Sequence, residues 1–374
     1  MGDMAVSGAR KRLLLYGANG YTGRLILDAA LARGLAVTVA GRRREAIEPL
    51  AGGRGVPFEV FPLDEAPRRL AERLEGFGAL LLAAGPFSRT SAPALSACLK
   101  ARVPYLDVTG EVPVLEAVYA RHAAAVRAGV PILPGLGFDV VPSDCLAACL
   151  AAALPGAVRL RLAVSGLKVS AGTARTMLEA LPKGGLARVD GRLVAVPVAW
   201  KARRIPFPGR PGLGMTIPWG DLSSAYRSTG IPNIETYAAV PPSWVPALRW
   251  ARPLLPLAGL PPLQALLASW VRKGVPEPDA QERERERAFV WGRVEDGKGR
   301  AAEGTVETLE GYALTAETSV LSAERVLRGM VRPGAWTPSR AFGARFVEAI
   351  RDTRLTVPPP VAGAPGPRRG PRRG

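Results

Sequence analysis

A glycine-rich turn near the start constrains the fold of this chain more than any other feature. Residues 13–26 read LLLYGANGYTGRLI, so a short apolar run leads into Gly17, Gly20 and Gly23, and an amphipathic segment follows at once. This pattern predicts a buried strand, a tight turn and a helix. The first glycine allows a sharp turn, the second allows close approach of a ligand, and the third allows the helix to pack on the strand.

The predicted turn has the properties of a dinucleotide-binding site. A helix N-terminus directs N–H groups and a partial positive charge toward a pyrophosphate. A glycine triplet alone also fits a packing turn, but here it opens the first strand–helix–strand unit, which favours the cofactor interpretation. The residues expected to contact the cofactor are Gly17, Asn19, Gly20, Tyr21, Thr22 and Gly23.

The end of the second predicted strand indicates which dinucleotide binds. Sites that prefer NAD carry an acidic residue about twenty residues beyond the glycines, where it holds the ribose 2′-hydroxyl. This chain instead has Gly41, Arg42, Arg43 and Arg44 there. Guanidinium groups bind a 2′-phosphate through charge-assisted hydrogen bonds, whereas a carboxylate repels it. The sequence therefore predicts NADP(H), with Arg42 and Arg43 as contacts; an ordinary basic loop is the alternative.

Strand-like and helix-like segments alternate through residues 1–153. Strands are expected at the short apolar runs 12–16, 36–40, 57–61, 79–84, 105–108 and 131–134. Helices are expected at 21–33, 66–74, 91–101 and 114–128. Apolar strands that alternate with helices are typical of a parallel sheet buried on both faces. The predicted fold class is α/β, with a Rossmann-type doubly wound sheet in the first domain.

The pattern changes after about residue 153, which predicts a second, α+β domain over residues 154–335 for substrate binding or dimerisation. Residues 158–166 alternate apolar and polar side chains, as expected for a half-exposed antiparallel strand. Two strand-like runs flank Asp296 and Gly297, a turn dipeptide that predicts a hairpin. Loops are expected at 206–211 and 241–246, a solvated segment at 281–287 and a disordered basic tail at 356–374.

Charge and cysteine usage exclude several classes of function. The net charge of +18 is spread along the chain with few aromatic residues between the basic ones, so no specific nucleic-acid partner is expected. Cys98, Cys145 and Cys149 form no CxxC pair, and no metal site is expected because no histidine or further cysteine lies near them. With no signal-sequence pattern at the start, they indicate the reduced cytoplasm.

An uncharged stretch of nineteen residues lies between Arg252 and Arg272. It is long enough to suggest a membrane-spanning helix. Four prolines, which include the adjacent Pro261 and Pro262, argue against one continuous helix. Two short apolar segments are expected instead, and their role stays open among a core or substrate cavity, a homodimer interface and peripheral contact with a lipid surface.

Five motifs follow one another along the first part of the chain. They are YGANGYTG at 16–23, AGRR at 40–43, AAGPF at 83–87, YLDVTGE at 105–111 and GLGFDVVPSD at 135–144. In this order they resemble the saccharopine dehydrogenase-like oxidoreductase family, and the chain is similar to trans-acting enoyl reductases. Segments 217–235 and 337–350 also look like bacterial members of the family. The resemblance covers residues 12–350 and does not specify a substrate.

The resemblance implies a Rossmann domain, a second domain with substrate contacts, and a C-terminal helix at 336–355 that returns to the first domain. It also implies that Gly85, Pro86 and Phe87 lie along the cofactor. Ligands of such sheets bind at the carboxyl ends of the strands, where these residues are expected. By the same argument the nicotinamide pocket is expected to be rimmed by Asp107, Thr109, Gly110, Glu111, Gly137, Phe138 and Asp139.

The sequence does not identify the proton donor that a reductase needs. The single histidine, His122, lies within a predicted helix, so a structural role is expected for it. Asp107 and Asp139 alternatively cap turns or pair with an arginine. The candidate catalytic residues are Tyr105, Asp139, Lys168 and Tyr226.

Three functions stay open at this point. The first is an NADP(H)-dependent enzyme that reduces a C=C or C=N bond of a small or acyl substrate, and the apolar stretch fits a lipid-like substrate. The second is a saccharopine-type amine dehydrogenase, in which amino-acid carboxylates would be bound by Arg175, Lys183, Arg203 and Arg204. The third is a membrane-peripheral or regulatory protein that binds NADP(H) without turnover.

Overall fold

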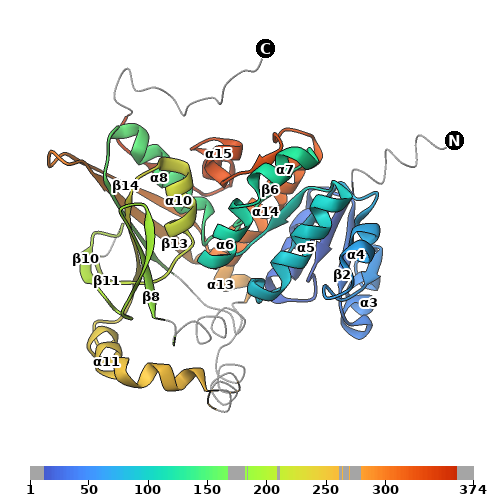
Figure 1. Cartoon of the computed structure of the whole chain (residues 1–374), viewed down its shortest axis with the longest axis horizontal. Helices are drawn as coiled ribbons and strands as arrows, with labels where there is room; N and C mark the ends of the chain where they lie inside the picture. The colour runs from blue at the N-terminus through green and yellow to red at the C-terminus, as the bar shows by residue number, and fades with distance from the viewer. Residues whose placement is uncertain are drawn as a thin grey trace.

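The computed structural model describes residues 12–166, 184–208, 211–260 and 279–359, together with Pro182, Leu263 and Ser269. Two sheets, each with its own helices, lie next to one another (Figure 1). Lys168, Arg175 and Lys183 fall outside the described residues.

The first sheet is parallel throughout and contains all six strands expected from the sequence. Its members are β1 (Leu13–Tyr16), β2 (Val37–Gly41), β3 (Phe58–Val60), β4 (Ala79–Leu82), β5 (Tyr105–Asp107), β6 (Pro131–Leu133) and β15 (Gly334–Ala335). Their order is β15-β6-β5-β4-β1-β2-β3, so β1 and β4 lie at the centre. This order is that of dinucleotide-binding sheets, and the predicted Rossmann-type fold is confirmed. β15 comes from the far end of the chain.

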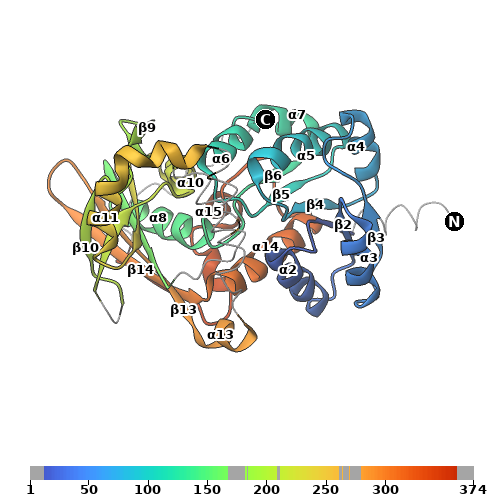
Figure 2. The ribbon, with the colours of Figure 1, turned by 90° about the horizontal axis from the view of Figure 1, so that it is seen from below.

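Helices cover both faces of this sheet (Figure 2). They are α2 (Tyr21–Ala32), α3 (Arg44–Gly52), α4 (Pro67–Leu74), α5 (Phe87–Ala101), α6 (Val112–Tyr119) and α7 (His122–Ala128). Alternate residues of β1 face opposite cores: Leu13 and Leu15 pack with α2, whereas Leu14 packs on the side of α4 and α5. Both faces of this sheet are therefore buried, which explains why the strands are continuous apolar runs.

Two of the predicted helices have different bounds in the structure. The helix expected at 114–128 is interrupted at Ala120 and Arg121 and forms α6 and α7. The helix expected from residue 91 begins at Phe87 instead. Its first turn is capped by the carboxylate of Glu111, which accepts from the backbone N–H groups of Phe87 and Ser88 at 2.8 and 3.2 Å. A cap supplied by such a distant residue leaves no local signal in the sequence.

The second sheet is mixed and confirms the predicted α+β character of the later part of the chain. Its strands are β7 (Arg159–Ser165), β8 (Gly185–Val189), β9 (Arg192–Val196), β10 (Ala202–Ile205), β11 (Gly212–Thr216), β12 (Asn233–Ala239), β13 (Arg287–Glu295), β14 (Ala301–Leu309) and β16 (Arg354–Thr356). The order is β10-β11-β12-β7-β13-β14-β16, with β8 and β9 attached beside β12. β13 and β14 form the predicted hairpin. β7 is a central strand, antiparallel to β13 but parallel to β12, so its expected antiparallel pairing holds on one side only.

The helices of the second part correct two sequence expectations. They are α8 (Val141–Ala153), α10 (Asp221–Thr229), α11 (Trp244–Ala251), η2 (Arg252–Gly259) and α13 (Ala280–Arg285). The loop expected at 241–246 contains the start of α11, because Pro246 stands in the first turn, where a helix tolerates proline. The segment expected to be merely solvated at 281–287 begins as α13, which Asp279 and Glu282 close with a reciprocal capping box.

The chain returns to the first sheet earlier than expected. The returning helix is α14 (Gly311–Leu327), which packs on α2 and is joined to it by ion pairs from Arg33 to Glu317 and Glu324. The segment expected to be that helix, 336–355, consists of α15 (Pro338–Phe342), η3 (Phe346–Ala349) and the start of β16, which joins the second sheet. Domain boundaries at residues 153 and 335 stay a prediction. Residues 360–374 of the expected tail lie outside the described part.

The uncharged stretch between Arg252 and Arg272 suggested a membrane-spanning helix in the later part of the chain. Within the described residues, none of the helices has both the length and the apolar character that crossing a bilayer requires.

Candidate cofactor and active site

The three glycines of the first turn have the geometry that the sequence argument requires. Gly17 has a φ of +90°, and a Cβ there would lie 2.7 Å from the Ala84 amide nitrogen. A Cβ on Gly23 would lie 2.2 Å from the Gly17 carbonyl oxygen, so the helix packs directly on the turn. At Gly20 the nearest atom to such a Cβ is 3.4 Å away, which leaves this side of the turn open. The cradle therefore fits a pyrophosphate.

The N-terminus of α2 adds an anion-binding surface to this turn. Gly20 is the N-cap and supplies no side chain, and the first turn contains no acidic residue. The first N–H groups of a helix have no acceptor within the helix itself, so they point toward the turn. Asn19 and Thr22 stand partly buried on either side of Gly20.

The basic residues after β2 differ in their availability. Arg44 forms an ion pair with Glu48 at 3.5 Å, and its guanidinium lies 5.4 Å from the Phe58 ring centroid. Arg42 and Arg43 are exposed and form no ion pair within the described part of the chain. These two arginines are therefore the ones placed to bind a 2′-phosphate at the carboxyl end of β2.

The loop after β4 lies directly over the glycine turn. Gly85 has open space around it, since a Cβ there would find its nearest neighbour, a Phe87 ring carbon, at 4.0 Å. Thr90 fixes the loop by donating to the Ala84 carbonyl oxygen at 2.6 Å. Pro86 and Phe87 lead into α5, whose N-terminus is occupied by the Glu111 carboxylate. Glu111 thus supports this loop instead of facing a substrate.

Asp107 and Tyr105 are structural groups beneath the site. Both side chains are fully buried, and the Tyr105 hydroxyl donates to Asp107 Oδ2 at 2.7 Å. Asp107 Oδ1 accepts from the backbone N–H groups of Thr109 and Gly135 at 3.0 and 2.9 Å, which joins the ends of β5 and β6. Burial raises the pKa of Asp107 to about 6 and that of Tyr105 well above its usual value. Neither group is accessible to a substrate, so the expected rim begins further along the chain.

Asp139 has the properties expected of a proton donor. It lies after β6, partly exposed, and a Cβ on Gly110 would be 2.2 Å from its Oδ2, so the carboxyl group rests on that glycine. It makes no hydrogen bond with the described residues, and burial alone raises its pKa to about 6. A carboxyl group that titrates close to neutral pH at the carboxyl end of a central sheet is a candidate acid.

Tyr226 lies elsewhere, at a contact between the two parts of the molecule. Its ring stacks on the Arg188 guanidinium at 4.2 Å, and a Cβ on Gly191 would be 3.1 Å from its hydroxyl. Arg188, which is almost completely buried, forms an ion pair with Glu116 of α6. The structure does not bring Tyr226 together with Asp139. The Arg188–Glu116 contact has no signal in the sequence, because seventy-two residues separate the pair.

His122 and the three cysteines have structural surroundings. His122 Nδ1 accepts from the Ala335 N–H at 3.1 Å and so fixes α7 to β15. Cys98, Cys145 and Cys149 are free, buried thiols. Within the described residues, no group of histidine, cysteine or carboxylate side chains is arranged to hold a metal ion.

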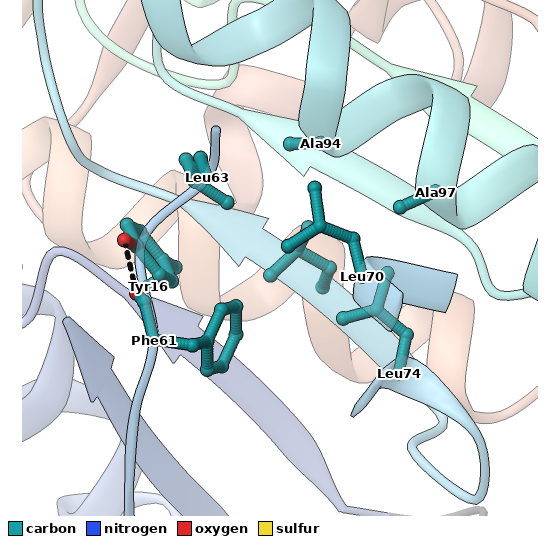
Figure 3. A pocket seen from close by; sticks show the side chains of 8 residues that line it. Tyr16, Phe61, Leu63, Leu70, Leu74, Ala94 and Ala97 are labelled. Atoms are coloured by element: carbon teal, nitrogen blue, oxygen red, sulfur yellow. Dashed lines mark hydrogen bonds between the residues drawn. The ribbon is translucent and has the colours of Figure 1, made fainter. Parts of the chain in front are cut away.

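A small apolar pocket between the first sheet and helices α4 and α5 belongs to the core (Figure 3). The Tyr16 hydroxyl already donates to the Phe61 carbonyl oxygen at 2.8 Å, so the pocket offers a dinucleotide little to bind. Burial raises the pKa of Tyr16 to about 12. The side chains around the pocket are Tyr16, Phe61, Leu63, Leu70, Leu74, Leu80, Ala94 and Ala97.

Comparison with known proteins bears on this geometry. Residues 13–133 match the family model described as the saccharopine dehydrogenase NADP binding domain. This part of the chain is therefore similar to saccharopine dehydrogenase NADP-binding domains. The match confirms the family resemblance and the expected NADP(H) cofactor class.

Relatives of the NADP-binding domain are known from bacteria and mammals. A trans-acting enoyl reductase from Mycobacterium leprae is 31% identical over 139 residues, which cover 35% of this chain and 33% of that protein. A saccharopine dehydrogenase-like oxidoreductase from Mus musculus is 28% identical over 151 residues, or 35% of each protein. The matched segment thus spans about a third of the length of these curated relatives.

The likeness in structure extends beyond the NADP-binding domain. The apo saccharopine dehydrogenase (L-Glu forming) from Saccharomyces cerevisiae gives a TM-score of 0.62 at 14% identity. The match covers 92% of this chain and 100% of that one, and at this identity it shows the fold alone.

Proposed function

We propose that this protein is an NADP(H)-dependent reductase that acts on a C=C or C=N bond of a small or lipid-like substrate. The observation that carries the proposal is the pairing of the glycine turn after β1 with the exposed Arg42 and Arg43 after β2, in a sheet of dinucleotide-binding order. Bound NADPH supplies the hydride. The chain's own residues bind the cofactor, exclude alternatives such as NADH and provide a proton.

Asp139 is proposed as the group that provides the proton. Reduction of a C=C or C=N bond consumes one hydride and one proton, and a carboxylic acid with a pKa of about 6 is still partly protonated near neutral pH. Its position after β6 places it on the same edge of the sheet as the glycine turn. Tyr105 is inaccessible and Tyr226 is engaged with Arg188, so Asp139 has the best support among the described candidates.

Reduction of a C=C bond is favoured over an amino-acid substrate. The enoyl reductase relatives support the first reaction. The second needs cationic clamps near Asp139, but the two proposed clamps that are described, Arg203 and Arg204, lie on β10 at one edge of the second sheet. Arg203 also lies 5.6 Å from the Tyr237 ring centroid, and Arg204 is exposed. A screen for NADPH oxidation with enoyl thioesters against imine-forming pairs of amines and oxo acids distinguishes the two reactions.

Cofactor preference tests the proposal directly. Titration by tryptophan fluorescence is expected to give a lower Kd for NADPH than for NADH. Arg42→Ala should weaken NADPH about tenfold or more and leave NADH unchanged, because a charge-assisted hydrogen bond to the 2′-phosphate contributes about 1.5–3 kcal/mol. The matched control is Arg44→Ala, since Arg44 is already paired with Glu48 and should not affect the preference. Equal affinities of the unaltered protein for the two cofactors would contradict the assignment.

A protein that binds NADP(H) without turnover is the remaining alternative. Under this alternative we expect the same cofactor preference but no NADPH oxidation with any substrate class in the screen. The two outcomes therefore separate binding from catalysis.

A further inference from the structure

A second group of side chains meets the glycine turn from the C-terminal half of the chain. Tyr21, the first residue of α2, contacts Tyr312 of α14 edge to face, with ring centroids 4.9 Å apart. Arg283 of α13 donates through Nη1 to the Tyr21 hydroxyl at 2.9 Å, and its guanidinium lies 5.8 Å from the centroid of that ring. Figure 2 shows α13 beside α2 and α14. Three segments far apart in sequence thus meet where the cofactor is expected to bind.

Glu310 supplies an independent observation at the same place. It is the N-cap of α14, and its Oε2 accepts from the N–H groups of Tyr312 and Ala313 at 2.9 and 3.1 Å. The residue is only 1% exposed, yet Oε1 has no hydrogen-bond partner among the described residues. A buried carboxylate oxygen without a donor is costly, so its presence beside the turn points to a ligand that supplies one.

We propose that Arg283 and Glu310 complete the cofactor site, with Arg283 binding the pyrophosphate and Glu310 Oε1 accepting from a hydroxyl of the nicotinamide ribose of NADP(H). A dinucleotide carries an anionic pyrophosphate between two riboses. It thus presents a phosphate for Arg283 and a hydroxyl group for Glu310 next to one another. The planar guanidinium suits phosphate oxygens, and a carboxylate oxygen suits a hydroxyl donor. The proposal rests on the proposed NADP(H) site. It makes the site depend on two segments outside the NADP-binding domain.

The arginine is tested by comparing two ligands that share the 2′-phosphate. NADPH contains the pyrophosphate, whereas adenosine 2′-monophosphate has neither a pyrophosphate nor a nicotinamide ribose. Arg283→Gln is expected to raise the Kd for NADPH about tenfold and to leave the Kd for adenosine 2′-monophosphate unchanged, as measured by calorimetry. Arg42→Ala should weaken both ligands. α13 contains no buried residue, so the substitution at Arg283 leaves the core intact.

The matched control is Arg285→Gln, which removes an exposed arginine from the same helix and changes the net charge equally. It should leave both affinities unchanged. An NADPH affinity that Arg283→Gln does not alter, or alters no more than Arg285→Gln does, would overturn the role of Arg283. If the unaltered protein binds no NADPH at all, the proposed function itself fails, so the two failures are distinguishable.

Glu310 is tested with Glu310→Gln, which keeps an oxygen to cap α14. Because the amide cannot satisfy both the cap and a hydroxyl with the strength of a carboxylate, NADPH is expected to bind several-fold more weakly. Adenosine 2′-monophosphate should bind as before. An unchanged NADPH affinity would assign Glu310 to capping alone and remove it from the site.

Discussion

Asp139 shows how one residue gives the proposed reaction a pH dependence. Burial raises its pKa from 3.8 to about 6, so the folded protein holds this proton more tightly than the unfolded chain. NADPH oxidation is expected to fall as the pH rises through about 6, because the proton donor ionises. Asp139→Asn should lower the rate about 100-fold and remove this limb of the pH–rate profile, while the Kd for NADPH at pH 5 stays unchanged. A substitution that preserves the limb would exclude Asp139 as the acid.

Substitution of the same residue is expected to raise the stability of the fold, although it lowers the activity. A carboxyl group with a raised pKa contributes stability that is fully present below the unfolded pKa of about 4 and is lost as the pH rises through about 6. Asp139→Asn removes this loss. We therefore expect the variant to match the unaltered protein at about pH 3 and to be more stable at pH 8 by roughly 2–3 kcal/mol in urea unfolding.

At the same scale, the sequence placed Asp139 among four candidates but had no means to rank them. The ranking depends on the complete burial of Tyr105 and on the stacking of Tyr226 against Arg188, and both follow from contacts between distant segments. Glu310 was not predicted at all, because an unpartnered buried oxygen is visible only once α14 is placed beside α2. The glycine turn could be predicted, since its geometry is local.

At the scale of elements, packing of α2 on β1 limits what the third glycine can become. Gly23→Ala would normally stabilise a helix by about 1 kcal/mol. Here the added Cβ meets the Gly17 carbonyl oxygen at 2.2 Å, so the helix must move away from the turn. We expect the variant to lose about 1–3 kcal/mol in urea unfolding and to bind NADPH more weakly. Gly52→Ala is the control, because a Cβ there meets no atom within 4 Å and should be neutral or stabilising.

The elements also show which secondary structure can be predicted from sequence. The six early strands were predicted within two residues at each end, since a strand buried on both faces is an uninterrupted apolar run. The return of the chain was placed at 336–355 instead of at α14. The buried side of α14 includes Thr318 and Ser319, whose hydroxyls face the Leu136 carbonyl oxygen at 2.6 and 3.4 Å. Because these buried residues are polar, the sequence of α14 shows only a weak helical periodicity of apolar residues, although the small side chains pack well against a neighbouring loop.

At the scale of the whole molecule, α11 and η2 project at the end of the second sheet (Figure 1). The exposed apolar side chains of these two helices, called the apolar face below, include Trp244, Trp250 and Leu254, which are 56%, 80% and 54% exposed. The guanidinium groups of Arg249 and Arg252 donate to backbone carbonyl oxygens of the neighbouring segment, so both cations are turned inward and hold the helices in place. A fixed face of tryptophan and leucine is suited to the boundary between water and lipid.

We propose that this face contacts anionic lipid surfaces. The net charge of +18 attracts such a surface and opposes self-association through the same face. The intact protein is expected to float with vesicles of phosphatidylserine and phosphatidylcholine, whereas Trp250→Ser with Leu254→Ser should stay in solution at unchanged Tm. Met330→Ser is the control, because Met330 is 64% exposed but lies between α14 and β15, outside this face. The apolar face and the cofactor site are on different sheets, so loss of flotation without loss of NADPH binding would assign these residues to lipid binding. An intact protein that never floats would contradict the proposal.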